Sequence, residues 1–140
     1  MRPDAAEWMR KAEADFVSMT REMNAAENFN YDLVCFLAQQ SVEKYVKALL
    51  CENSVPFPKT HDLNELTALL PEHLACPESF DATISRLDRY AVEFRYPGAS
   101  ATKELAAEAV AGARAFRDWC RKALKLSRAP HKMRHRTAKT

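Results

Sequence analysis

Apolar side chains recur every three or four residues along five separate stretches of this chain, which is the spacing of one face of an α-helix. The chain contains 23 alanines and 13 leucines against seven valines and one isoleucine, and it has only two glycines. This balance favours helix over sheet, because alanine and leucine are strong helix formers whereas β-branched residues prefer strands. The pattern predicts an all-α protein, an up-and-down bundle of four to five helices.

The first two helices have recognisable beginnings. Asp4 is followed three residues later by Glu7, which is capping-box spacing, and predicts a helix over about residues 4–24. Asn30 is placed to cap a second, long helix that runs to about Glu52. Both helices carry a continuous apolar face, so we expect them to pack against each other and against the later helices.

Three further helices complete the predicted bundle. Asp62 is expected to cap a short helix that stops at Pro71. A fourth helix is closed by Tyr96-Pro97-Gly98, and a fifth continues to about Leu126, with Gly112 leaving room for another helix to approach closely. The residues expected on the apolar faces are Ala5, Trp8, Ala12, Phe16, Met19, Met23, Leu37, Val42, Tyr45, Ala48, Leu49, Phe80, Ile84, Leu87, Ala91, Phe94, Leu105, Ala109, Ala113, Phe116, Cys120 and Leu124.

The charge distribution separates a body from a tail. At 140 residues and 15.9 kDa the chain has the size of one domain. Residues 1–127 contain 16 Lys and Arg against 19 Asp and Glu, whereas residues 128–140 contain five basic residues and no acidic one. We therefore expect a helical domain over 1–127 and a disordered basic extension over 128–140. That extension is either a frayed terminus or a weak nucleic-acid-binding segment through Arg128, Lys132, Arg134, Arg136 and Lys139.

Several functional classes are excluded or disfavoured by missing signals. No run of 18 apolar residues and no secretion signal is present, which predicts a cytoplasmic protein. The four cysteines lie far apart without a C-x-x-C pair, so we expect free buried thiols rather than a zinc or dithiol site. Two glycines cannot form a Walker phosphate loop or a dinucleotide fingerprint, and G-x-S-x-G and H-E-x-x-H are absent. No metal site and no cofactor is predicted.

A stripe of polar residues follows the second helix. Gln40, Glu43, Lys44 and Lys47 fall within an arc of about 100° opposite the apolar face, and we expect this stripe to face outward. Two interpretations remain open at this point. The stripe is either part of a binding site or a solvated helix face with one surface salt bridge between Glu43 and Lys47, which stand at i and i+4.

Two further positions carry candidate binding chemistry. His61 precedes the third helix, where it is either a phosphate donor or base, or a turn residue with a satisfied hydrogen bond next to the cap Asp62. Arg95 and Tyr96 lie at the end of the fourth helix. They are suited to holding a phosphate while the ring stacks on a base, but Arg95 there also interacts favourably with the helix dipole without any ligand.

The order of these segments resembles the HEPN family, named for higher eukaryotes and prokaryotes nucleotide-binding. The resemblance covers residues 5 to about 125, and it rests on Trp8 with Ala12–Phe16, Ala38–Leu50 with its Gln39-Gln40 and Glu43-Lys44, Thr60-His61-Asp62-Leu63 and Arg95-Tyr96-Pro97. It implies a four- or five-helix bundle that is usually a homodimer. It also implies a frequent association with a separate minimal nucleotidyltransferase in toxin–antitoxin modules.

Many members of the family that this chain resembles are metal-independent ribonucleases with an Arg, four to six residues, and then a His. Here the positions that follow Arg95 at that distance, 100–102, read Ser-Ala-Thr, and we treat the similar spacing of Arg128 and His135 in the tail as accidental. The resemblance therefore predicts a non-catalytic, dimeric, nucleotide- or RNA-binding protein with no catalytic residue. Two alternatives are a ribonuclease with an atypical active site, in which Arg95 holds the phosphate and His61 acts as the base, and a structural dimerisation scaffold.

Overall fold

The structure, a computed structural model, describes the backbone of residues 1–139 and the side chains of residues 1–125. Its α-helices are α1 (Pro3–Met23), α2 (Tyr31–Glu52), α3 (Leu63–Ala68), α4 (Asp81–Glu93) and α5 (Lys103–Lys139). Two 3₁₀ helices, η1 (Glu72–Leu74) and η2 (Glu78–Phe80), connect α3 to α4. Within residues 1–139 there is no strand, and the predicted all-α class is confirmed.

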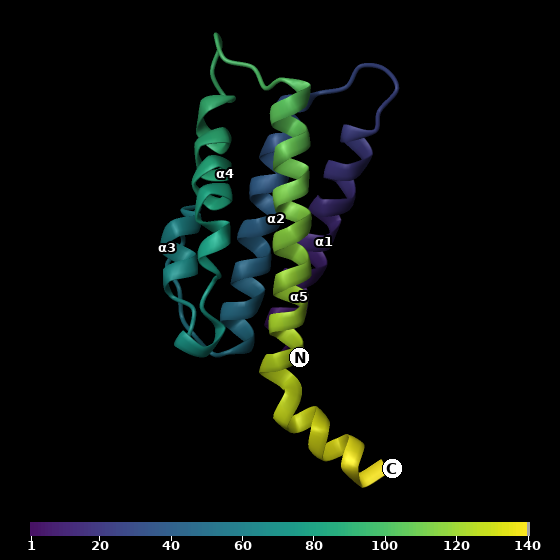
Figure 1. Cartoon of the computed structure of the whole chain (residues 1–140), viewed down its shortest axis with the longest axis vertical. Helices are drawn as coiled ribbons and strands as arrows, with labels where there is room; N and C mark the ends of the chain where they lie inside the picture. The colour runs from purple at the N-terminus through teal and green to yellow at the C-terminus, as the bar shows by residue number, and fades with distance from the viewer. Residues whose placement is uncertain (140) are drawn as a thin grey trace.

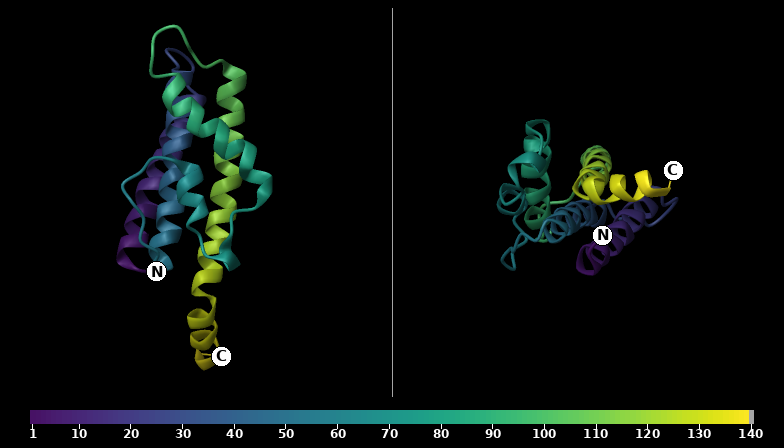
Figure 2. Two further views of the ribbon diagram at one scale, coloured as in Figure 1. Left: turned by 90° about the vertical axis from the view of Figure 1, so that its left-hand side faces the viewer. Right: turned by 90° about the horizontal axis from the view of Figure 1, so that it is seen from below.

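Helix α2 occupies the centre of the bundle. The long helices α1, α2, α4 and α5 run alongside one another, and the short α3 lies beside α4 at the outer edge (Figure 1). Seen from below, α2 lies between α1 and α4, and α5 packs over it (Figure 2). Helix α2 contacts each of the other four α-helices. Because it is surrounded in this way, polar residues on α2 can be enclosed even where the sequence suggests a solvent-facing side.

The predicted cap of α2 is confirmed, whereas that of α1 is wrong. The Asn30 side chain accepts a hydrogen bond from the amide of Leu33 at 3.0 Å, as an N-cap should. Helix α1 begins at Pro3, and its N-cap residue makes no side-chain capping bond. Proline is favoured at the first helical position, so Asp4 lies inside the first turn, where its carboxylate accepts from the amide of Ala5 instead.

The apolar faces form one core, as their spacing predicts. Gly112 allows α5 to approach α4 closely, because a Cβ at this position would lie 2.6 Å from Cγ2 of Thr83. Glycine therefore serves the predicted purpose at this crossing. The residues from the predicted faces that are buried are Ala5, Ala12, Phe16, Met19, Val42, Tyr45, Ala48, Leu49, Ile84, Leu87, Ala109, Ala113, Phe116, Cys120 and Leu124.

The burial of two cysteines differs from the prediction. All four cysteines are free, and Cys35 and Cys120 are buried as expected, but Cys51 and Cys76 are partly exposed. In the part of the chain that is described, no helix has the length and apolar character needed to span a membrane. The bounds of α5 extend past the predicted end at about Leu126. The side chains of residues 126–140, including the basic tail residues, lie outside the described part, so the division at residue 127 and the role of the tail stay predictions.

Candidate functional site

A pocket opens between α2, the turn before α3 and the last turns of α4. Its volume is about 420 Å³. These three segments are far apart in the sequence, so only the fold brings them together. The lining residues are Gln39, Gln40, His61, Asp62, Asp88, Ala91, Val92 and Arg95.

Two of the four residues in the polar stripe of α2 are buried, which corrects the prediction that the stripe faces outward; Gln40 and Lys44 are partly exposed. Glu43 is 2% exposed and Lys47 is 6% exposed. The ammonium of Lys47 lies 5.1 Å from the ring centre of Trp8 on α1 and 5.9 Å from that of Phe57 in the segment after α2. The ion pair between Lys47 Nζ and Glu43 Oε2, 2.9 Å long, is therefore a buried one. Helical periodicity could not show this, because the covering groups come from elsewhere in the chain.

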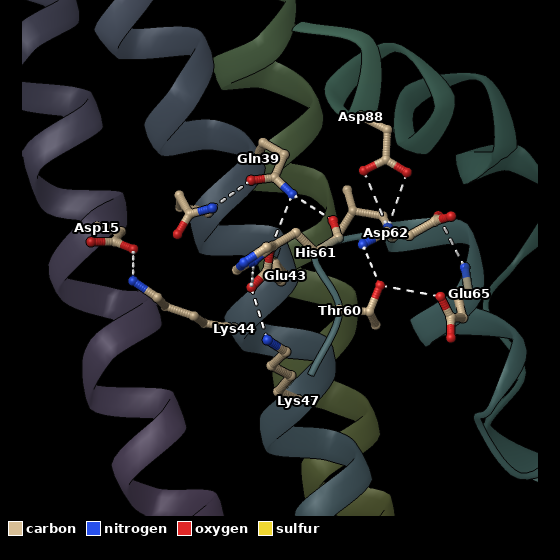
Figure 3. A network of polar contacts seen from close by, with 12 residues as sticks. Asp15, Gln39, Glu43, Lys44, Lys47, Thr60, His61, Asp62, Glu65 and Asp88 are labelled. Carbon is tan, nitrogen blue, oxygen red and sulfur yellow. Dashed lines mark hydrogen bonds and ion pairs between the residues drawn. The ribbon is translucent and has the colours of Figure 1, made fainter. Parts of the chain in front are cut away.

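Glu43 collects hydrogen bonds from three directions (Figure 3). Besides the bond from Lys47, its Oε1 accepts from Gln39 Nε2 at 3.2 Å, and Nδ1 of His61 lies 3.2 Å from both carboxylate oxygens. Gln40 donates in turn to the carbonyl oxygen of the Gln39 side chain at 2.7 Å. A buried carboxylate is tolerated when it is paired and hydrogen-bonded in this way. The chain of contacts links the pocket wall to the buried ion pair.

The turn that carries His61 is held by its own side chains and by α2. Thr60 Oγ1 accepts from the amide of Asp62 and donates to Glu65, both at 3.1 Å. The Asp62 carboxylate accepts from the amides of Asn64 and Glu65, which confirms the predicted N-cap of α3. Gln39 Nε2 also donates to the main-chain oxygen of His61 at 3.1 Å. The result is a turn in which the His61 backbone and ring are both attached to α2 while its side chain remains 82% exposed.

Asp88 is a pocket residue that the sequence reasoning missed. Its carboxylate accepts from the amide of Leu63 at 3.0 and 3.2 Å and from the side chain of Asn64 at 3.4 Å. Burial raises the pKa of Asp88 above its usual value, and the neighbouring carboxylate of Asp62 adds to the increase. A signal was present in the sequence. Asp88 is followed three and four residues later by Ala91 and Val92 on the same face of α4, and Arg95 comes just past the end of that helix.

Arg95 supplies the cation of the pocket. Its guanidinium lies 5.6 Å from the ring centre of Phe36 on α2, in a cation–π contact. Among the described side chains, no carboxylate lies within ion-pair distance of Arg95, although carboxylates of Asp62 and Asp88 line the same pocket. The guanidinium is exposed and therefore accessible to a ligand anion.

The predicted site residues divide into two groups. Gln40, His61, Asp62 and Arg95 line the pocket, with Glu43 and Lys47 behind it. The other two do not reach it: Lys44 forms an ion pair with Asp15 of α1, and Tyr96, 65% exposed, follows the end of α4 outside the pocket lining. No group of three metal-ligating side chains occurs among the described residues.

Comparison with known proteins gives a match to one family model and to solved structures of similar fold. A family model described as HEPN domain matches residues 5–123. The structure of TT1696 from Thermus thermophilus has a TM-score of 0.76 and 22% identity, with 87% of this chain and 99% of that one covered. An archaeal HEPN homologue, ST0689, has a TM-score of 0.70 and 26% identity, with 89% of this chain and all of that one covered. No relative of the chain is found among curated proteins.

Proposed function

This chain belongs to the HEPN domain family, and we propose that it is a non-catalytic member that binds a ribonucleotide unit, free or within RNA, in the pocket between α2 and α4. We further propose that it acts as a homodimer and as the accessory partner of a minimal nucleotidyltransferase in a toxin–antitoxin-like module. The observation that carries the binding proposal is the convergence of Gln40, His61, Asp62 and Arg95 on one pocket.

The charges around the pocket favour a ligand with both an anionic and a donor-rich part. Arg95 offers a planar cation suited to a phosphate. Asp62 and Asp88 would repel a second anion but accept hydrogen bonds from hydroxyl or amino groups. A nucleotide meets both requirements, with its phosphate at Arg95 and its sugar or base toward the carboxylates. The volume of about 420 Å³ falls within the range of small-molecule sites.

Calorimetric titration of the purified protein tests this assignment. Arg95→Ala is expected to weaken binding of AMP, and of a short single-stranded RNA, by roughly 10- to 100-fold, the loss expected for hydrogen bonds to a charged group. Arg89→Ala is the matched control, because Arg89 is likewise an exposed arginine but lies on α4 outside the pocket lining. If the protein binds only the RNA, its ligand is a polymer; if it binds only AMP, its ligand is a free nucleotide. Equal affinities of the two variants for both probes would contradict the pocket assignment.

Exposed apolar side chains near the pocket support the proposed assembly. Leu33 at the start of α2 is 36% exposed and Val92 on α4 is 59% exposed, and a shallow hollow between these helices is lined by Leu33, Phe36, Phe94 and Arg95, among others. Contiguous exposed apolar groups are typical of interaction surfaces, and we place the dimer contact on this side of the bundle. We expect Val92→Lys to lower the molar mass measured by light scattering. Val17→Lys, at a 51% exposed valine of α1, should leave the mass unchanged.

The partner is tested separately from the dimer. If the neighbouring reading frame encodes a small nucleotidyltransferase, we expect the two proteins to co-purify when expressed together. A parent protein that stays monomeric at all concentrations, or that does not associate with such a neighbour, would contradict this part of the proposal.

One observation favours a second candidate, an atypical ribonuclease. His61 and Arg95 line the same pocket, and Glu43 contacts the His61 ring, which is an arrangement of base, orienting carboxylate and phosphate-binding cation. In such a reaction Nε2 of His61 takes the proton of an RNA 2′-hydroxyl as its oxygen attacks the adjacent phosphorus. The bond from phosphorus to the 5′-oxygen breaks, and that oxygen leaves as a hydroxyl after taking a proton from water. Incubation with total RNA decides between the two candidates. Cleavage by the parent that disappears in His61→Ala would overturn the non-catalytic assignment.

A further inference from the structure

The ring of His61 meets a carboxylate whose oxygens already serve as acceptors. Glu43 Oε2 accepts from Lys47 Nζ at 2.9 Å, and Oε1 accepts from Gln39 Nε2 at 3.2 Å. The carboxylate is thus ion-paired with an ammonium, and both of its oxygens are used as hydrogen-bond acceptors. Nδ1 of His61 lies 3.2 Å from both oxygens. An unprotonated Nδ1 would bring its lone pair against two acceptor oxygens, and the contact is favourable only when Nδ1 carries the hydrogen.

We propose that Glu43 holds the neutral imidazole of His61 in its Nδ1–H form, so that Nε2 presents an unprotonated lone pair to the pocket. Glu43 is then a positioning residue, because it acts on a pocket ligand only through His61. Within residues 1–125, Nε2 has no hydrogen-bond partner, whereas Nδ1 faces Glu43 (Figure 3). The bond made by one ring nitrogen decides the state of the other.

Charged groups face the His61 ring from two sides. The charged groups that face it are Glu43 and Lys47 behind it and Asp62, Asp88 and Arg95 around the pocket. Glu43 and Lys47 form an ion pair of zero net charge behind the ring. The main-chain oxygen of His61 accepts a hydrogen bond from Gln39, which fixes the backbone from which the ring reaches Glu43.

The pocket should therefore prefer a ligand that donates a hydrogen bond to Nε2 of His61. A hydroxyl or amino hydrogen satisfies an unprotonated nitrogen, whereas a phosphate oxygen does not. Arg95 therefore takes the anionic part of the ligand, and His61 takes a hydrogen-bond donor from its sugar or base. This role in recognition rests on the proposed nucleotide-binding function, but the state of the His61 ring does not.

Nitrogen-15 NMR of the ligand-free protein reads the ring directly, at a pH about two units above the ordinary histidine pKa. We expect Nδ1 of His61 to resonate as a protonated nitrogen and Nε2 as an unprotonated one, with the signals assigned from the spectrum of His61→Gln. Exposed His73 on η1 is the internal reference and should show the opposite form, which free histidine prefers. A His61 ring protonated at Nε2 in the parent protein overturns the proposal, whether or not the pocket binds a ligand.

Variants test the role of Glu43. Glu43→Gln should move the His61 signals toward the Nε2–H form and weaken AMP binding roughly three- to tenfold, as expected for one hydrogen bond between neutral groups. Glu43→Gln combined with Lys47→Met gives the same readout without an unpaired buried ammonium, in case the single variant folds poorly. Unchanged His61 signals in both folded variants would remove Glu43 from the proposal. AMP binding that is lost in Arg95→Ala but unaffected by these variants would refute the role in recognition while leaving the binding function intact.

Discussion

Replacing Lys47 with methionine tests whether the ion pair beneath the pocket is truly buried. Methionine keeps the length of the side chain and its contact with the rings of Trp8 and Phe57 but removes the charge. Glu43, 2% exposed, then loses the ammonium at 2.9 Å and keeps only Gln39 and His61 as hydrogen-bonding neighbours. An uncompensated carboxylate is left in the interior.

The expected loss of stability is large for a single side chain. Removing one partner of a buried ion pair costs about 3–5 kcal/mol. The two remaining donors to Glu43 place this case near the lower end, at about 3 kcal/mol. For a chain of this size that corresponds to a Tm lower by roughly 10 °C. The same pair exposed to solvent would contribute about 1 kcal/mol or less, so the two situations are clearly separated.

Urea denaturation followed by far-UV circular dichroism at neutral pH measures the difference. Lys11→Met, at an exposed lysine of α1, is the matched control and should change the free energy of unfolding by no more than about 0.5 kcal/mol. The double variant Glu43→Leu/Lys47→Met leaves no buried charge and should recover at least half of the loss. The reasoning is refuted if Lys47→Met stays within about 1 kcal/mol of the parent, or if the double variant is less stable than Lys47→Met alone.

Three further predictions concern packing, pH and thiol reactivity. Gly112→Ala should lower the free energy of unfolding by about 1 kcal/mol or more, because its Cβ would meet Cγ2 of Thr83 at 2.6 Å. In urea denaturation, adding Thr83→Ser should restore the lost stability. A Gly112→Ala variant more stable than the parent would show that the higher helix propensity of alanine outweighs the steric contact. Because the pKa of Asp88 is raised on folding, the folded chain binds the carboxyl proton of Asp88 more tightly than the unfolded chain does. The contribution of Asp88 to stability therefore falls as the pH rises from the ordinary aspartate pKa through the pKa of the folded chain. Asp88→Asn should therefore gain stability relative to the parent as the pH rises in denaturation series, and a constant difference would contradict this. Burial raises the pKa of Cys35 to about 12, so its thiol should react slowly in the folded protein. Native-state alkylation followed by mass spectrometry should label the partly exposed Cys51 well before Cys35. Equal labelling rates would contradict the burial of Cys35.

The fold was largely predictable because its signals are local. The caps at Asn30 and Asp62 depend on side chains that reach amides two or three residues away, and both predictions are confirmed. The Asp4 cap was wrong because a competing local signal, Pro3 at the first helical position, decides where α1 begins. Gly112 is correctly placed at a close helix crossing, although the sequence alone could not identify Thr83 as its neighbour.

The candidate site was predictable only in part. Helical spacing placed Lys44 and Lys47 together, yet Lys44 pairs with α1 and Lys47 is buried behind the pocket. The spacing shows that two residues share a face, but it does not show which neighbour covers that face. Asp88 was missed for the same reason, since its role depends on the amide of Leu63, 25 positions earlier in the chain.

The sequence by itself determined the helices, their apolar faces and the family resemblance, because turns of a helix and capping bonds join residues that are close along the chain. The tertiary structure alone decided that Glu43 and Lys47 are buried, that His61 meets Glu43, and that Arg95 shares a pocket with them. Desolvation is the physical reason: whether a charge stands in water or in the interior depends on which distant segments pack over it. The spacing of residues along the chain does not show which distant segments will cover them.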